Sequence, residues 1–260
     1  MAGNAATLRS RVEAALAGRI PAPFTYRDFR VETAPFNIPE IDALTGGLPR
    51  GSLTEIYGPS CSGRTTLLLS ILASRTAHGE VCALVDGRDA FDPHTAQAAG
   101  VNLEQLLWVR CRTVDQALRA TDLLIQGGGF GLIALDLSDI PEKTVRDVPL
   151  NAWFRFRRAV ENTSTILLFL DQAPNARTCA SLVLGLSFEP ARWSITFRTQ
   201  IRGLPYACLL DGSRIRAELL RSRLQPAIGA PERHDFVSAD KSGSATICET
   251  KTSRGFISAA

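Results

Sequence analysis

The stretch from Gly58 to Thr66 constrains the fold of this chain more than any other. It reads Gly-Pro-Ser-Cys-Ser-Gly-Arg-Thr-Thr, so four residues separate two glycines, and a cation and two hydroxyl residues follow. This is the spacing of a phosphate-binding loop, G-x-x-x-x-G-K-[ST], with arginine in place of the lysine. A loop of this kind needs a β-strand before it and an α-helix after it.

The residues on either side of the loop meet that requirement. Leu53–Tyr57 is a short β-rich run, and Leu67–Ala73 is an apolar run of helical character. In a strand–loop–helix unit, successive backbone N–H groups and the helix N-terminus point at a bound anion. Gly58 and Gly63 supply the backbone freedom that this cradle needs. The alternative is a Gly/Ser-rich turn that matches by chance, and the flanking strand and helix argue against it.

Arg64 is the main departure from the pattern. Lysine reaches the β- and γ-phosphates as a compact charge, whereas arginine is a broad planar fork, so the exchange is not conservative. We expect binding through the backbone amides to survive. Hydrolysis depends on charge placed where the transition state develops it, and we expect it to suffer. Thr65 is the hydroxyl expected on Mg²⁺, and Thr66 is a second hydroxyl at the start of the helix.

Composition bounds the remaining possibilities. The chain has 260 residues with 45% hydrophobic content, which suits one α/β domain with extensions. A net charge of +3 is far from a strong nucleic-acid signature. No long apolar run and no signal-peptide pattern occur, so we expect a cytoplasmic protein without a membrane segment. The six cysteines are scattered without C-x-x-C pairs, which favours reduced thiols.

Strand and helix patterns alternate along the middle of the chain. Strands are predicted at 53–57, Val81–Asp86, Leu106–Arg110, Leu132–Asp136 and Thr165–Leu170, and helices at 65–77, 92–99, 114–126 and 150–162. Nearly continuous apolar strands between helices indicate an α/β fold, a mostly parallel sheet covered on both faces. Two later runs, Trp193–Thr199 and Ile215–Arg223, alternate and are predicted to be antiparallel strands added at one side.

The chain ends differ from this middle part. Residues 5–18 have the pattern of an amphipathic helix, followed by a proline-containing connector. Beyond about Pro226 the composition turns to Ala, Ser, Gly and Pro, which predicts a disordered tail. The expected organisation is therefore an N-terminal helix and connector at 1–36, a core at 37–225 and a tail at 226–260.

Two further polar positions follow predicted strands. Leu132–Asp136 is an apolar strand that ends in aspartate, the arrangement in which a carboxylate holds the Mg²⁺ shell beside a phosphate loop. A capping aspartate is the alternative, and the upstream loop favours the metal role. Asp171 and Gln172 follow the next apolar strand, at the sheet edge where open α/β folds bind ligands.

Several segments together resemble the bacterial RecA recombinases. The segment 46–59 closely resembles the start of the RecA ATPase core, and 86–93 is similar to the family's segment after its next strand. Asp171-Gln172 stands where that family has an Asn-Gln pair, and 217–223 resembles its late strand with two basic residues. The resemblance covers about residues 37–225 and implies a RecA-like P-loop ATPase core that uses ATP and Mg²⁺.

The resemblance also implies roles for individual residues. Gln172 would couple the γ-phosphate to a DNA-binding loop, and Arg221 and Arg223 would reach the ATP of a neighbouring subunit in a head-to-tail assembly. The alternative for these arginines is an edge strand protected by charge. The expected nucleotide-binding residues are Gly58, Pro59, Ser60, Cys61, Ser62, Gly63, Arg64, Thr65, Thr66, Asp136, Gln172, Arg221 and Arg223, with Thr65 and Asp136 as metal ligands.

The chain departs from the family at positions that matter for hydrolysis. Arg88 matches the family's glutamate that activates the attacking water, and an arginine cannot act as a general base. The segment after Asp136 and the segment Ala173–Leu182 are both short, and the second lacks the glycine-rich stretch of a DNA-binding loop. A strand-exchange enzyme is therefore not the first expectation, and no catalytic residue is assigned.

The same features resemble the ImuA (SulA-like) mutagenesis accessory proteins, or a separate RecA paralogue beside them. That resemblance implies a DNA repair and damage-response accessory protein of the SOS response, with weak or no ATP hydrolysis. Such a protein supports error-prone translesion synthesis through partners, either RecA or a Y-family polymerase relative. The alternative is an ATP-dependent, single-stranded-DNA-binding recombinase-type ATPase, in which Asp89 or Asp86 replaces the lost base.

Overall fold

A computed structural model describes residues 32–188, 192–195, 208–212, 215–223 and 244–247, all within the compact unit Glu32–Ala260. Side chains are described for 32–188 and 215–223. The helix predicted at 5–18 lies outside the described residues. The helices are α2 (Pro39–Thr45), α3 (Arg64–Ala77), α4 (Pro93–Ala98), α5 (Val114–Gly127), α6 (Glu142–Arg146) and α7 (Leu150–Val160), with short 3₁₀ turns η1 (Leu103–Gln105) and η2 (Arg177–Cys179).

The strands form one large sheet and two small ones. They are β1 (Thr33–Ala34), β2 (Leu48–Pro49), β3 (Ser52–Tyr57), β4 (Cys82–Asp86), β5 (Leu106–Arg110), β6 (Leu132–Asp136), β7 (Ile166–Asp171), β8 (Leu182–Phe188), β9 (Arg192–Ile195), β10 (Cys208–Gly212), β11 (Ile215–Ser222) and β12 (Ser244–Ile247). The eight-stranded sheet has the order β12-β11-β8-β3-β7-β6-β4-β5. β1 pairs with β2, and β9 pairs with β10, in both cases antiparallel.

The mostly parallel α/β sheet predicted from the sequence is confirmed. β5, β4, β6, β7, β3 and β8 run parallel, whereas β11 pairs antiparallel with both of its neighbours, β8 and β12. The five predicted strands from 53–57 to Thr165–Leu170 agree with β3 to β7 within one residue at each end. Because parallel neighbours end together, the carboxyl ends of β3, β6 and β7 lie along one edge of the sheet.

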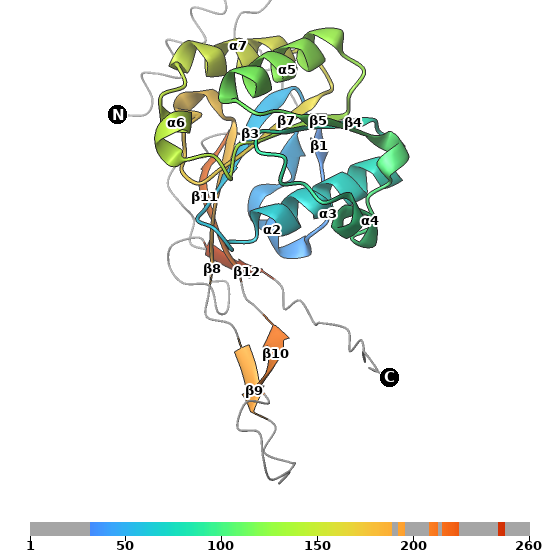
Figure 1. Cartoon of the computed structure of the whole chain (residues 1–260), viewed down its shortest axis with the longest axis vertical. Coiled ribbons are helices and arrows are strands. Elements are labelled where there is room, and N and C mark those ends of the chain that lie inside the picture. The colour runs from blue at the N-terminus through green and yellow to red at the C-terminus, as the bar shows by residue number, and fades with distance from the viewer. Residues whose placement is uncertain (1–31, 189–191, 196–207, 213–214, 224–243, 248–260) are drawn as a thin grey trace, which may run out of the picture. The chain divides into compact units, whose positions relative to one another are not determined.

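Helices cover both faces of this sheet. α5 and α7 lie on one face, and α2, α3 and α4 lie on the other (Figure 1). Each face has its own apolar core, and the central strands β7 and β4 are buried along their whole length. Trp153 and Phe156 of α7 are buried and pack in the core beside Phe169, which explains the aromatic residues among the arginines of that helix.

Local signals account for several helix ends. Thr113 caps α5 by accepting a hydrogen bond from the Gln116 N–H, and Asp92 caps α4 through the amides of His94 and Thr95. α2 ends at Gly46, which has a left-handed φ of 77°. The four helices predicted at 65–77, 92–99, 114–126 and 150–162 agree with α3, α4, α5 and α7 within two residues, whereas α2 and α6 were not predicted.

Five strands were not predicted, namely β1, β2, β8, β10 and β12. β8 is an apolar run interrupted by Gly185, directly after a short loop, and it inserts between β3 and β11. β12 lies within the segment 226–260 that was expected to be disordered, and it pairs with the outer edge of β11. Four residues are too few for a periodic pattern, and the open edge of β11 supplies the hydrogen-bond partners that fix them. The rest of that segment lies outside the described residues.

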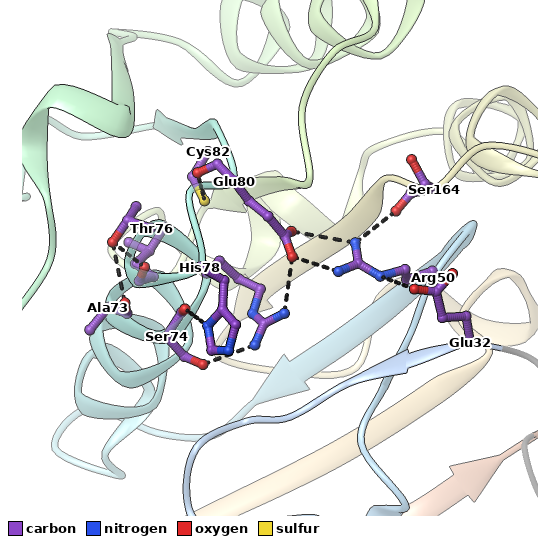
Figure 2. Close-up of polar contacts among 11 residues, drawn as sticks. Glu32, Arg50, Ala73, Ser74, Thr76, His78, Glu80, Cys82 and Ser164 are labelled. Carbon is purple, nitrogen blue, oxygen red and sulfur yellow. Dashed lines mark hydrogen bonds and ion pairs between the residues drawn. The ribbon is translucent and has the colours of Figure 1, made fainter.

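A buried ion network joins the two elements that flank the glycine-rich loop (Figure 2). Glu80, between α3 and β4, accepts hydrogen bonds from Arg50 Nη2 at 2.6 Å and from Arg75 Nη1 at 3.1 Å. Arg50 precedes β3, and Arg75 lies in the last turn of α3. Arg50 also donates to the carbonyl of Ser164 and faces Glu32. The network therefore ties the start of β3 to the end of α3, and so helps to fix the geometry of the loop between them.

Candidate functional site

The loop between β3 and α3 adopts a tight, partly left-handed conformation. Cys61 has a φ of 63° and Gly63 a φ of 90°, and the Ser62 N–H donates to the Pro59 carbonyl at 3.2 Å. α3 then begins at Arg64 without a side-chain cap. The first amides of a helix have no intrahelical partner, so this N-terminus is available to an anion. The backbone has the features that the sequence motif predicts.

Close packing explains why both glycines are needed. A Cβ on Gly58 would lie 2.3 Å from the Leu186 carbonyl oxygen and 2.6 Å from Ser62 Oγ. A Cβ on Gly63 would lie 2.1 Å from Cδ1 of Ile215. The loop is therefore pressed against β8 and β11, so the late strands help to shape the phosphate cradle.

The side chains of the loop divide into an outer and an inner set. Pro59, Ser60, Cys61, Thr65 and Thr66 are exposed. Ser62 and Arg64 are buried, with 1% and 6% of their surface exposed. Ser62 Oγ and Arg64 Nη1 have no hydrogen-bond partner among the described residues. Buried polar atoms are normally paired, and these two lie in the loop that the motif assigns to a ligand.

Arg64 faces the carboxylates at the ends of β6 and β7. Burial lowers the pKa of its guanidinium, while Asp136, Asp139 and Asp171 act in the opposite direction. No carboxylate of the described residues lies within ion-pair distance of Arg64. The positive charge of Arg64 therefore interacts with several carboxylates, and it forms an ion pair with none of those in the described residues.

Asp136 lies at the end of β6, as predicted. Its Oδ1 accepts hydrogen bonds from the backbone N–H and the hydroxyl of Ser138, at 2.9 and 2.5 Å. Burial raises the pKa of the Asp136 carboxyl, and the two bonds from Ser138 partly offset that rise. In register, Asp136 pairs with Leu170 of β7, so the carboxylate lies next to the strand that ends in Asp171.

Asp171 and Gln172 connect the end of β7 to the neighbouring segments. Burial raises the pKa of Asp171 to about 6, although it accepts hydrogen bonds from Asn175 Nδ2 and from the Gln172 N–H. The Asp171 carbonyl accepts from the Gly58 N–H. Gln172 Nε2 donates to the carbonyls of Ser138 at 2.9 Å and Ile140 at 3.3 Å. Gln172 thus links β7 to the segment that follows Asp136.

Glu55 is a buried acid that the sequence patterns did not assign. It lies in β3, fully buried, and its Oε1 accepts hydrogen bonds from the amides of Asn175 and Ala176 at 2.7 and 2.8 Å. Its Oε2 has no hydrogen-bond partner among the described residues, and burial raises its pKa to about 7. The signal in the sequence was a charged residue inside an apolar strand. Glu55 fastens the loop after Gln172 to the strand that leads into the phosphate loop.

The two acids considered as replacements for a catalytic base are both engaged. Asp86 accepts hydrogen bonds from the amides of Arg88 and Phe91 and from Trp108 Nε1. Asp89 is paired with Arg110. Arg88 itself is exposed at the end of β4. Each acid therefore already has hydrogen-bond or ion-pair partners that hold it in a structural role.

Arg221 and Arg223 lie away from the Gly58–Thr66 loop of the same chain. β11 is antiparallel to β8, so its first residue, Ile215, is the one that approaches Gly63. At its other end, Arg221 donates to the carbonyl of Arg177 and Arg223 to the carbonyl of Thr178. Burial, and then the positive charges of Arg157 and Arg221, lower the pKa of Arg223. A role at phosphate groups would therefore need a neighbouring subunit, and it stays a prediction.

The arrangement fits a polyphosphate better than it fits Mg²⁺. The cradle offers backbone amides, the exposed hydroxyls of Thr65 and Thr66, and a buried cation. For a metal it offers Thr65 and Asp136, but one oxygen of Asp136 is occupied by Ser138 and a guanidinium is directed at the same acidic edge. No cluster of three or more His, Cys, Asp or Glu side chains suited to a metal occurs in the described part of the chain.

Comparisons with known proteins agree with this architecture. Residues 29–143 match the RecA N-terminal domain family. This part of the chain is similar to the RecA N-terminal domain. Over 91 residues, 35% of this chain, it is 47% identical to protein RecA of Cereibacter sphaeroides and of Ectopseudomonas oleovorans, and 46% identical to protein RecA of Methylococcus capsulatus. The chain spans about a quarter of the length of these relatives, since the matches cover 26% of each.

The matched region has a clear boundary. It contains the phosphate loop, Arg88 and Asp136, and it ends in α6. Gln172, Arg221 and Arg223 lie beyond it, so their similarity to RecA stays an expectation. None of the helices in the described ranges has the length and hydropathy needed to cross a membrane.

Proposed function

We propose that this chain is a RecA-like accessory protein of DNA repair and the damage response, which binds ATP at Gly58–Thr66 and hydrolyses it weakly or not at all. The observation that carries this proposal is an intact phosphate cradle with arginines at two positions used for hydrolysis. Arg64 is buried in the loop, and Arg88 is exposed where the water-activating carboxylate is expected. Backbone amides bind phosphate without either residue, whereas hydrolysis needs both roles filled.

The proposed role is support of error-prone translesion repair in the cytoplasm, as part of the SOS response. Two short segments support an accessory role over strand exchange. Residues 137–149 contain only α6, and residues 173–181 contain only η2, which is fastened to β3 through Glu55. These segments leave little chain for DNA-binding loops. The expected partners are therefore proteins, namely RecA or a Y-family polymerase relative, as the resemblance to the ImuA group implies.

Head-to-tail self-assembly is part of the same proposal. Arg221 and Arg223 lie at the end of β11 opposite to the one that touches the phosphate loop. They can therefore reach a phosphate only in another copy of the chain, and contacts between two different surfaces of this kind produce rings or filaments.

Binding of ATP to the Thr65→Ala variant tests the nucleotide site. Thr65 is exposed at the first turn of α3, and losing its hydroxyl should weaken ATP binding about tenfold, the value of one hydrogen bond to a charged group. Thr144→Ala is the matched control, because Thr144 is also exposed in a helix but lies in α6. Equal affinities for the two variants would place the nucleotide elsewhere.

A second candidate function is a recombinase-type ATPase that binds single-stranded DNA. The environment of Asp171 favours it. Burial raises the pKa of this carboxyl to about 6, a value that suits a general base, and its negative charge interacts with Arg64 at the start of α3. Under this alternative, DNA affinity would fall steeply with salt, because several phosphates would be neutralised. Under the accessory role, binding is weak and its salt slope is shallow.

A further inference from the structure

Arg64 differs from a loop lysine in where its charge lies. The side chain is 6% exposed, so it is buried and does not extend into solvent. Nη1 is buried without a hydrogen-bond partner among the described residues, as is Oγ of Ser62 two residues earlier. A guanidinium donor in such a position is costly unless a ligand completes it. The two unpartnered atoms therefore point to an oxygen-rich ligand inside the loop.

The carboxylates that face Arg64 already have hydrogen-bond donors. Asp136 accepts two bonds from Ser138, and Asp171 accepts bonds from Asn175 and from the Gln172 amide. The negative charge of Asp139, which is exposed, also raises the pKa of the Arg64 guanidinium. Two further negative charges affect these carboxyl groups: Asp86 raises the pKa of Asp136, and Glu142 raises the pKa of Asp171. The carboxylates at this edge of the sheet are therefore stabilised by hydrogen bonds from the protein and by the positive charge of Arg64.

A hydrated Mg²⁺ has different needs. It requires near-octahedral coordination at short distances and keeps several waters, so it needs room and freely available oxygens. Arg64 is buried at the start of α3, directly after the loop, and Ser138 donates two hydrogen bonds to Oδ1 of Asp136, the aspartate expected to hold the metal. A guanidinium has five donors in a fixed fork and bridges two phosphate oxygens at once.

We propose that Arg64 takes over the charge-neutralising role of the divalent metal, so that this site binds a nucleoside triphosphate or another polyphosphate without Mg²⁺. The inference rests on the proposed function, since it requires that phosphates bind at Gly58–Thr66. It goes further because the P-loop pattern expects a metal on Thr65, and here the arginine makes that metal dispensable.

The test compares ATP affinity in Mg²⁺ and in EDTA, by calorimetry, for the wild type and for Arg64→Lys. The wild-type affinity should change less than about threefold when the metal is removed. Arg64→Lys restores the compact cation of the usual pattern, and its ATP affinity should fall about tenfold or more in EDTA. Thermal unfolding of both proteins, with and without ATP in each buffer, provides a second readout and shows that the variant is folded.

The outcomes distinguish a failure of this inference from a failure of the proposed function. A wild-type loss of tenfold or more in EDTA would overturn the inference and leave the proposed nucleotide site intact. Metal-independent binding by both proteins would overturn the assignment to Arg64. Failure of the wild type to bind ATP in either buffer would overturn the proposed function together with the inference.

Discussion

Replacing Glu80 by glutamine should destabilise the protein strongly although it removes only one charge. The Glu80 carboxylate lies between Arg50 and Arg75, at 2.6 and 3.1 Å (Figure 2). The side chain of Arg75 is 4% exposed, that of Arg50 is 15% exposed and that of Glu80 is 20% exposed. Glutamine keeps the shape of the side chain but leaves the buried Arg75 without an opposite charge.

The magnitude follows from burial. Breaking a largely buried ion pair by removing one partner costs about 3–5 kcal/mol, because an uncompensated charge stays in the interior. Since Glu80 is partly exposed, we expect the lower end, about 3 kcal/mol. For a domain of this size each kcal/mol lowers Tm by roughly 2–4 °C, so the expected drop is about 6–12 °C.

Urea and thermal unfolding of Glu80→Gln measure this loss, and Glu32→Gln is the matched control. Glu32 also faces Arg50, at 3.4 Å, but its side chain is 78% exposed, so its removal should cost less than about 0.5 kcal/mol. A loss below about 1 kcal/mol for Glu80→Gln would refute the reasoning. It would show that water or backbone groups satisfy the two arginines without the carboxylate.

Three further predictions concern the loop and its surroundings. The pKa of Glu55 is raised from 4.5 to about 7, so its neutral form is favoured in the folded state. The wild type should therefore lose about 3 kcal/mol relative to Glu55→Gln as the pH rises from below 4.5 through 7, and parallel stability curves would contradict this. Cys61 is an exposed thiol in the loop, so ATP should slow its reaction with a maleimide, as followed by peptide mapping; an unchanged rate would place ATP elsewhere. Gly63→Ala should be less stable in urea than Gly79→Ala by about 1–3 kcal/mol, because both glycines have positive φ but only Gly63 would clash, with Ile215. Equal losses would show that Ile215 yields without cost.

The periodic part of the fold was predictable from the sequence. β3 to β7 are apolar runs of five or six residues, and α5 combines a threonine cap, an amphipathic pattern and a C-terminal glycine. Such signals come from residues that are close together in the sequence. Packing in the interior of an α/β fold favours the same strands and helices. The position of Asp136 beside β7 followed in the same way, because neighbouring parallel strands end together.

Features that depend on contacts between distant segments were not predictable. Gly185 broke the pattern of β8, whose place in the sheet depends on pairing with both β3 and β11. The antiparallel direction of β11 was predicted, but its register, which places Ile215 and not Arg221 beside Gly63, was not. The raised pKa of Glu55 arises from complete burial, which a strand pattern does not reveal for a charged residue.

The measurement that tests the central claim most directly follows ATP binding and ATP turnover in one sample of the wild type, with Mg²⁺ and single-stranded DNA. A variant lacking residues 58–66 provides the background. We expect ATP to bind, because the loop amides and Arg64 remain, and turnover to stay at background, because Arg88 cannot activate water. Turnover clearly above background and stimulated by DNA would contradict this expectation, and would make the chain an active ATPase with arginine in the place of lysine.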